Sequence, residues 1–415
     1  MPAPIVILGT LDTKGSETQY LRDKVAALGA QPLVVDAGIL NAAAFEPEID
    51  REAVAAAAGT TTHDLVSQGD RGQAVERMGR GAARIVADLH ARGQLGGIIA
   101  IGGSGNATIA GLAMRALPIG VPKLIVSTVA AGDTRPYVGT ADITLMYPIV
   151  DISGINRLSR QILTNAAGAI VGMVNAGASA RDEEQLRPLI AATMFGVTTP
   201  CVTAAREELE SLGYEVLVFH ATGVGGRSME SLIRDGFITG VLDITTTELA
   251  DEVAGGSLSA GPDRLEAAGA AGIPQVVSLG ALDMANFGPL AGLPEQFRGR
   301  LLHQHNPSVT LMRTTPEENA VLGQLIAEKL NRARGPAALV IPLRGVSEIS
   351  VEGAIFHSRE ADAALFQALR GYLDARVELI EVDAQINDPQ FATTLVQTFH
   401  RLYTGGKEVA HDPAH

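Results

Sequence analysis

The sequence predicts an α/β protein with two doubly wound domains and mainly parallel sheets. Short apolar runs typical of buried strands, such as Ile5 to Leu8 and Ile98 to Ile101, alternate with amphipathic helical stretches. Glycine-rich turns follow these runs, and the chain holds 46 glycines and no tryptophan. The same strand, turn and helix pattern starts again near Pro188. This alternation favours parallel strands covered by helices on both faces, and therefore two Rossmann-like domains.

Composition and charge exclude several classes of protein. The 415 residues, 46% of them hydrophobic, are enough for two or three domains with apolar cores. A net charge of −14 argues against a nucleic-acid or membrane-surface partner, because phosphate groups are bound by basic patches. No apolar run approaches the roughly 20 residues of a membrane span, and the N-terminus lacks a basic signal region. With Cys201 as its one cysteine, the chain is expected to be cytoplasmic.

The first domain is expected over residues 1–178. It begins with a βαβ unit whose helix ends at Gly29 and whose second strand is Leu33 to Val35. A polar, alanine-rich insertion follows from Asn41 to Asp70, and we interpret it as a lid or an oligomer contact. The remaining elements expected in this domain are the helix Gln73 to Ala91, the strands Lys123 to Val129 and Ile143 to Met146, and the helix Leu158 to Val174.

A polar turn at Gly9 to Glu17 follows the first strand, at the sheet edge where open parallel sheets bind ligands. Asp12 is suited to hold Mg²⁺ directly or through water, and Lys14 to contact a phosphate. Hydroxyl groups for phosphate oxygens are offered by Thr10 and Thr13. The alternative is a solvated loop with Ser16 as the helix N-cap. Asp36, at the end of the second strand, is either a ribose-binding acid or a turn former.

The strand Ile98 to Ile101 breaks into a glycine turn that leads directly into a helix. Such a turn suits a phosphate, because glycines let a ligand approach the backbone and a helix start offers unpaired N–H groups. The spacing is neither G-x-G-x-x-G nor a P-loop, so a tight turn after a buried strand is the alternative. The candidate ligand-binding residues here are Gly102, Gly103, Ser104, Gly105, Asn106 and Thr108.

A third polar strand end follows the strand that begins at Lys123, and it offers Ser127, Thr128, Gly132 and Asp133. The carboxyl ends of parallel strands meet at one edge of the sheet, so these residues are expected near the first two turns. Hydroxyl groups, glycines, one acid and one base are what a nucleotide pocket with magnesium requires. The first domain is therefore predicted to bind a nucleotide.

The stretch from Ala176 to Arg187 contains small residues followed by charged ones, which is typical of a linker. The second domain is expected over residues 186–405. Residues 406–415 are expected to form a disordered tail. The second domain repeats the architecture of the first, and its expected strands include Pro188 to Met194, Tyr214 to Phe219 and Ala338 to Ile341.

The second domain carries its own candidates for anion binding. The turn Gly223 to Gly226 precedes a helix expected to begin at Ser228, and it is a second turn suited to an anion. The side chains of Arg227, Arg313 and Arg344 are suited to clamp a carboxylate or phosphate, although each alone is more typical of a surface ion pair.

Candidate catalytic residues of the second domain are Asp283, His303, His305, Arg344 and Ser347. On an extended segment His303 and His305 share one face, so with Asp283 they are candidates for a metal site. His220 or His357 is an alternative general base near neutral pH. Cys201 lies in the first turn of a helix, where it is either a thiolate of lowered pKa or a small buried residue. Motifs of zinc and serine hydrolases are absent from the sequence.

In combination these motifs resemble the Tm-1-like ATP-binding family. The resemblance rests on Gly9 to Lys14, Gly102 to Gly105 and Ser127 to Asp133, and it extends to His305-Asn306-Pro307 and Arg344 to Ser347. It implies two Rossmann-like domains, ATP with Mg²⁺ in the N-terminal one, and a homodimer or higher homo-oligomer.

Three functions are compatible with these features. The first is an enzyme that uses ATP, or acts on a small anionic carboxylate or phosphate substrate, at a cleft between the domains. The second is a binding protein regulated by ATP without turnover. The third is a nucleotide-independent hydrolase or lyase that uses the His, Asp and Arg residues of the second domain.

Overall fold

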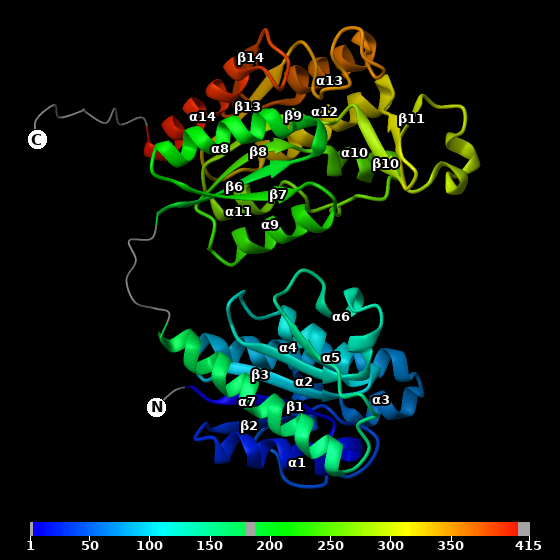
Figure 1. Cartoon of the computed structure of the whole chain (residues 1–415), viewed down its shortest axis with the longest axis vertical. Coiled ribbons are helices and arrows are strands. Elements are labelled where there is room, and N and C mark those ends of the chain that lie inside the picture. Colours follow the sequence, from blue (N-terminus) through cyan, green and yellow to red (C-terminus); the bar gives the residue numbers. More distant parts are fainter. Residues whose placement is uncertain (1–2, 180–186, 406–415) are drawn as a thin grey trace, which may run out of the picture. The chain divides into compact units, whose positions relative to one another are not determined.

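Each half of the chain is built on a parallel sheet with helices on both faces (Figure 1). The computed structural model describes residues 3–179 and 187–405, and the chain divides into two units, residues 1–184 and 185–415. The expected tail at 406–415 and most of the expected linker at 176–187 lie outside the described residues.

The N-terminal unit has a five-stranded sheet in the order β2-β1-β3-β4-β5, and all of its strand pairs are parallel. Its elements are β1 (Ile5–Gly9), α1 (Leu11–Ala27), β2 (Pro32–Asp36), α2 (Arg51–Ala57), α3 (Thr62–Gln68), α4 (Arg71–Ala91), β3 (Gly97–Gly102), α5 (Ser104–Arg115), β4 (Lys123–Ser127), α6 (Arg135–Val138), β5 (Thr144–Met146) and α7 (Arg157–Ser179).

Alternate residues of each strand pack on opposite faces of this sheet, as the two-residue period of a strand requires. On one face Ile7 and Ile99 pack with α1 and α7, and on the other Leu8 and Ile98 pack with α2, α4 and α5. Both faces are therefore apolar, which explains why β1 and β3 are continuous apolar runs in the sequence.

The insertion after β2 folds into α2 and α3 and then joins α4. The side chains of Asp50 and Thr61 cap α2 and α3, and Val54 of α2 is fully buried in the core. The α2 backbone also approaches α4 closely, because a Cβ atom added at Gly81 would lie 2.0 Å from the Val54 carbonyl oxygen. This insertion is therefore a packed part of the domain, with weak periodicity because it contributes only a few core residues.

The C-terminal unit has a six-stranded parallel sheet in the order β14-β13-β9-β8-β6-β7 and a small antiparallel sheet in the order β10-β12-β11. Its elements are β6 (Leu189–Met194), α8 (Thr199–Ser211), β7 (Glu215–His220), α9 (Val224–Arg234), β8 (Gly240–Thr245), α10 (Thr247–Ala254), α11 (Ala267–Ala271), β9 (Gln275–Gly280), β10 (Met284–Phe287), β11 (Leu302–Asn306), β12 (Val309–Arg313), α12 (Pro316–Asn331), β13 (Ala337–Pro342), α13 (Arg359–Tyr372), β14 (Glu378–Val382) and α14 (Pro389–Thr404).

Both units place their second strand outside the first and their third beside the first, so the predicted repetition of one architecture is confirmed. In the C-terminal unit α8 and α14 cover one face of the sheet, and α9 to α13 cover the other. The antiparallel sheet was not expected from the sequence. In the described residues, no helix has the length and apolarity that crossing a membrane requires.

A buried ionic cluster holds the C-terminal unit together beneath α9 and α10. The fully buried guanidinium of Arg264 donates two hydrogen bonds to Asp243, of 2.5 and 2.7 Å, and one of 2.7 Å to Glu248. Glu230 lies 3.5 Å from the same guanidinium, and burial raises the pKa of its carboxyl. The positive charge of Arg264 thus compensates buried carboxyl groups on β8, α9 and α10.

We predict that Arg264→Met destabilises the C-terminal unit by about 3–5 kcal/mol, because it leaves buried carboxylates without their cation. Pulse proteolysis of the full chain in urea, with surviving fragments identified by mass, measures the stability of this unit. Arg227→Met is the control, since this exposed arginine makes one hydrogen bond, to the Ser259 carbonyl oxygen. Equal effects of the two substitutions would contradict the role given to the cluster.

Candidate functional site

The candidate site of the N-terminal unit lies at the carboxyl edge of its sheet, where the chain connections diverge. The strand β1 has β2 on one side and β3 on the other, and α1 and α5 pack on opposite faces. Open α/β sheets bind ligands at such a switch point. A cavity of about 550 Å³ lies here, lined by the starts of both helices and by segments from β2 to α4.

The starts of α1 and α5 form one wall of the cavity, and the N-cap residue of neither helix caps it with its own side chain. Their N-cap residues, Thr10 and Gly103, make no side-chain cap hydrogen bond. By contrast, Asp50, Thr61 and Asp70 cap the helices α2, α3 and α4 with their side chains. The first N–H groups of a helix lack intrahelical partners and carry a partial positive charge. The start of α5 therefore makes this wall suited to an anion, whereas in α1 the N–H of Leu11 already donates to Asp36 Oδ1.

The glycines at these turns have different roles. A Cβ atom at Gly9 would lie 2.8 Å from the Thr18 hydroxyl, so glycine allows α1 to pack closely on β1. Gly102 has a φ of +154°, which glycine adopts readily and other residues avoid. Gly103 lines the cavity, and a Cβ atom there would meet nothing within 4 Å. Space beside the Gly103 backbone is thus open to a ligand.

The candidates Thr10, Asp12, Thr13 and Lys14 all line the cavity. The expected turn from Gly9 to Glu17 is wrong, as is the N-cap at Ser16, because α1 begins at Leu11 with Thr10 as its N-cap. The hydroxyl groups of Thr10 and Thr13 lie 2.8 Å apart. Asp12 accepts hydrogen bonds through Oδ2 from the backbone N–H of Leu40, at 2.7 Å, and of Asn41. The Lys14 ammonium donates to the carbonyl oxygen of Ile152. This turn therefore contributes one acid and one cation to the cavity.

Asp36 does not line the cavity, and its geometry matches the turn-forming alternative. Its Oδ1 accepts hydrogen bonds of 2.9 Å from the backbone N–H groups of Leu11 and Gly38. The side chain is 1% exposed, and burial raises the pKa of its carboxyl. Asp36 thus connects the end of β2 to the start of α1 below the ligand space.

At the start of α5, Asn106 faces the cavity and Thr108 does not. Asn106 is 6% exposed, its Nδ2 donates to the Ile101 carbonyl oxygen, and its Oδ1 has no hydrogen-bond partner among the described residues. A buried acceptor without a partner costs free energy unless a ligand or water supplies the donor. The hydroxyl of Thr108 instead donates to the Ser104 carbonyl oxygen, 2.9 Å away in the same helix. Ser104 and Gly105 line the cavity beside Asn106.

Sequence reasoning missed the wall formed by α3 and α4. Leu65, Val75 and Met78 give it apolar surface, and the exposed Arg71 at the start of α4 adds a cation. Arg71 makes no ion pair within the part of the chain that the structure describes. The available signal was the break at Gly69-Asp70 before an amphipathic helix, which places Arg71 in the first helical turn.

The third predicted strand end does not reach the cavity. Ser127 is buried at the end of β4, where its Oγ accepts from the Val129 N–H, and Thr128 begins a short 3₁₀ helix. Asp133 forms an exposed ion pair with Arg135, which lowers the pKa of the Asp133 carboxyl to about 2. Neither these residues nor Gly132 lines the cavity. In the sheet β3 lies between β1 and β4, so the end of β4 is one strand away from the switch point.

In the C-terminal unit, the structure brings Asp283 and Ser347 together. They follow the adjacent strands β9 and β13, and the Ser347 hydroxyl donates a 2.8 Å hydrogen bond to Asp283 Oδ2. Both side chains are fully buried, and Asp283 Oδ1 has no hydrogen-bond partner among the described residues. Burial raises the pKa of the Asp283 carboxyl to about 6.

Among the described residues, the other predicted catalytic residues make no hydrogen bond to this pair. Arg344 is exposed and forms two 2.6 Å hydrogen bonds with Asp383. His303 and His305 lie on the edge strand β11, which is extended as expected. Within the described ranges, no group of three or more His, Cys, Asp or Glu residues is placed to hold a metal ion.

The groups expected to bind an anion in this unit are already paired within the protein. The Gly223 and Gly226 N–H groups donate to Glu248 Oε1, at 2.6 and 3.0 Å, and α9 therefore begins at Val224 rather than at the expected Ser228. Arg313 is buried and donates to Asp362 at 2.8 Å and to the Phe356 carbonyl oxygen at 2.7 Å.

Three further candidates are placed by their surroundings. Cys201 is buried, and burial raises the pKa of its thiol to about 12, so the alternative of a small packing residue is confirmed. His220 is exposed and its ring lies 5.5 Å from the ring of Phe195. His357 Nδ1 lies 3.2 Å from the Ser350 carbonyl oxygen.

Comparison with known proteins places the whole chain in one family. Models of the uncharacterised protein family UPF0261 match it, the N-terminal domain over residues 3–179 and the C-terminal domain over residues 187–403. The UPF0261 protein of Clostridium tetani is 54% identical over 398 residues, which cover 96% of this chain and 98% of that protein. The UPF0261 protein RA0729 of Rhizobium meliloti is 47% identical over 400 residues, with coverage of 96% and 98%.

A tomato protein is also similar. The ToMV resistance protein Tm-1(GCR237) of Solanum lycopersicum is 44% identical over 349 residues, which cover 83% of this chain and 46% of the tomato protein. A putative UDP-N-acetylglucosamine 2-epimerase structure from Listeria monocytogenes has 10% identity and a TM-score of 0.23, too low for a functional comparison. The predicted resemblance is confirmed: the chain belongs to the UPF0261 family, and the tomato Tm-1 proteins are among its homologues.

Proposed function

We propose that the N-terminal unit binds ATP with Mg²⁺ in the cavity between α1 and α5. The observation that supports this most directly is the uncapped start of α5 on a cavity at the switch point of the sheet, with Lys14 and Arg71 lining the same cavity. A triphosphate needs several N–H donors and cations, and a nucleoside needs an apolar surface beside them. The cavity offers both kinds of wall, in a volume of about 550 Å³ that falls within the range of ligand pockets.

In this proposal the phosphates lie against the starts of α1 and α5. The N–H groups after Gly103 and the cations Lys14 and Arg71 neutralise their charge. The base packs on the apolar wall that contains Leu65 and Met78. The unpartnered Oδ1 of Asn106 accepts from a ribose hydroxyl, an amino group or a water molecule on the ligand.

The residues of the cavity also fit a magnesium ion. Magnesium in nucleotide sites is held by one or two carboxylates together with phosphates and waters. Asp12 and Asp151 both line the cavity. Asp12 uses Oδ2 for backbone N–H groups, and its Oδ1 makes no hydrogen bond within the described part of the chain. When bound, Mg²⁺ would neutralise phosphate charge beside these carboxylates.

The cavity supports both an ATP-using enzyme that acts on a small anionic metabolite and a binding protein that ATP regulates. In the C-terminal unit, Arg227, Arg313 and Arg344 are each engaged with other groups of the chain. The described contacts therefore support nucleotide binding more strongly than an anionic substrate site. Conversion of ATP to ADP with small carboxylic acids separates the two functions, and light scattering of the same samples tests the expected homo-oligomer.

A second candidate function is a nucleotide-independent reaction at Asp283 and Ser347. It is favoured by the free Oδ1 of Asp283, because a fully buried carboxyl with one hydrogen bond does not contribute to folding as a well-paired acid would. Unfavourable groups of this kind occur at functional sites. Here Asp283 would exchange a proton with the Ser347 hydroxyl or with a substrate.

We predict that Gly103→Val weakens Mg-ATP binding at least about tenfold without unfolding the protein. The φ of −80° at Gly103 is accessible to valine, and the added atoms enter open space on the cavity wall. Isothermal titration calorimetry measures the affinity. Gly172→Val on the exposed surface of α7 is the matched control, since a Cβ atom there also meets nothing within 4 Å. Unchanged affinity in Gly103→Val would exclude phosphate binding at this turn.

We predict that Arg71→Gln weakens ATP binding about tenfold and reduces the dependence of affinity on salt, because one charge-assisted contact to phosphate is lost. Titration calorimetry at two salt concentrations measures both effects. Arg77→Gln is the control, because Arg77 is exposed on the same helix and does not line the cavity. Equal losses in the two variants would point to general charge effects and not to a contact of Arg71.

We predict that the effect of Asp283→Asn on the free energy of unfolding, relative to the parent, is more favourable at pH 8 than at pH 4. The difference between the two pH values is expected to reach up to ~3 kcal/mol. The Asp283 carboxyl has a pKa of about 6 in the folded chain and an ordinary value of 3.8, so ionisation disfavours folding as pH rises from 4 to 6. Urea denaturation at both pH values measures the difference. Asp251→Asn serves as the comparison: its carboxyl also has a pKa of about 6 but accepts three hydrogen bonds from N–H donors, so its replacement should destabilise. Parallel pH profiles for Asp283→Asn and the parent would refute the prediction.

A further inference from the structure

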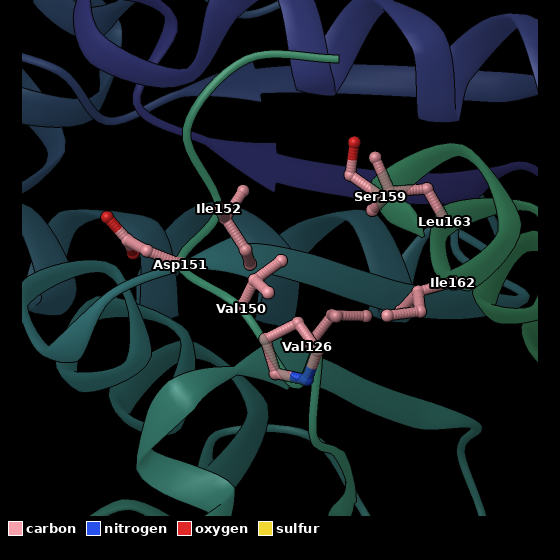
Figure 2. A pocket seen from close by; sticks show the side chains of 8 residues that line it. Val126, Val150, Asp151, Ile152, Ser159, Ile162 and Leu163 are labelled. Carbon is pink, nitrogen blue, oxygen red and sulfur yellow. The ribbon is translucent and has the colours of Figure 1, made fainter. Parts of the chain in front are cut away.

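The segment from Tyr147 to Gly154, between β5 and α7, separates the nucleotide cavity from a small apolar recess. Figure 2 shows Val150 and Ile152 pointing toward Val126 and Ile162, while the Asp151 carboxylate points the other way. Asp151 is exposed and lines the cavity as well as the recess. This segment, which we name the 147–154 segment, therefore contributes Asp151 to the wall of the cavity.

Two side chains of α1 hold the 147–154 segment in place. The Lys14 ammonium donates to the Ile152 carbonyl oxygen, and Glu17 Oε1 accepts a 2.6 Å hydrogen bond from the Gly154 N–H. Glu17 is 3% exposed, so this second contact is shielded from water and from the cavity. Lys14 differs, because it lines the cavity while it holds the segment.

The backbone is strained close to the Lys14 contact, at Ile149. Ile149 has a φ of +67°, which a β-branched residue rarely adopts, and its side chain is 61% exposed. Lys14 itself has non-helical angles, φ −129° and ψ 26°, inside α1. Burial of Ile149 does not compensate for its conformation. The conformation is held by the 2.7 Å hydrogen bond from the Val150 N–H to the Pro148 carbonyl oxygen and by the contacts that fix the segment on either side.

We propose that Lys14 is a nucleotide-operated switch that releases the 147–154 segment when a triphosphate enters the cavity. The proposal rests on the nucleotide site proposed above. Without a ligand, the Lys14 ammonium is bound to a neutral carbonyl oxygen. A phosphate oxygen is the stronger acceptor, because both partners of that hydrogen bond are charged. The ammonium therefore moves to the phosphate, and the Ile152 carbonyl oxygen loses its donor.

Release lets Ile149 return to an extended φ and loosens Val150 and Ile152 from the recess, while the Glu17 contact keeps the segment attached at Gly154. Binding of a nucleotide in the cavity thereby changes the conformation of exposed apolar residues at the surface. These residues include Tyr147, Ile149 and Val150.

The experiment measures amide hydrogen exchange of the full-length chain by mass spectrometry, with and without saturating Mg-ATP. We expect peptides that cover residues 147–156 to exchange about fivefold to tenfold faster with nucleotide, the factor expected from loss of one hydrogen bond. Peptides from the starts of α1 and α5 should exchange more slowly in the same sample, because their N–H groups then bind phosphate.

Lys14→Met separates the switch from simple ligand binding. In this variant the segment should exchange rapidly without nucleotide, and nucleotide should change its rate less than about twofold. The helix starts and Arg71 still bind ATP, so nucleotide is used at a concentration that calorimetry shows to be saturating. Lys24→Met, on the same helix, removes a cation that lies over the Tyr20 ring and should respond as the parent does.

The outcomes distinguish failure of the switch from failure of the nucleotide site. Binding of ATP without faster exchange at 147–156, or the parental response in Lys14→Met, would overturn the switch and leave the nucleotide site standing. Absence of any calorimetric signal with ATP would overturn the proposed function, and the switch with it.

Discussion

The apolar character of both sheet faces is the constraint on which the rest of the structure depends. Strands such as β1 and β3 have no polar side, so helices must cover the sheet above and below. Right-handed crossovers between parallel strands place helices on both faces only if strands are added on both sides of one central strand. The starts of α1 and α5 then diverge at the carboxyl edge, and the cavity lies between them. The site is therefore a consequence of how the core is covered.

The C-terminal unit shows that this topology alone does not make a ligand site. Its switch point lies between β6 and β8, where the buried hydroxyls of Thr198 and Thr245 are 2.8 Å apart and Thr193 donates to Asp243 at 2.7 Å. Asp243 in turn binds the buried Arg264. At this switch point the polar side chains thus bind one another, whereas in the N-terminal unit glycines leave space open at the corresponding position.

Much of the fold could be predicted because its signals are local. Consecutive residues determine the continuous apolar runs, the amphipathic helices and the glycine turns. The expected boundaries of most strands therefore lie within one or two residues of those observed. The polar residues Thr10 to Lys14 do lie at the switch point, but the expected turn was too long, because α1 already begins at Leu11. The antiparallel sheet was not predicted, because β11 and β12 are short segments of polar or mixed composition. Their pairing depends on the fold around them.

The remaining part of the site could not be predicted, because whether a polar group is available depends on partners far away in the sequence. Gly223 and Gly226 look as suited to an anion as Gly103, yet Glu248, more than twenty residues later, accepts their N–H groups. Conversely, the break at Gly69-Asp70 indicates only that Arg71 lies in the first turn of a helix, and the fold then brings it to the cavity. A turn becomes a ligand site when the rest of the chain leaves its hydrogen-bonding groups unpaired, and unpaired groups of this kind are found only after the long-range contacts are known.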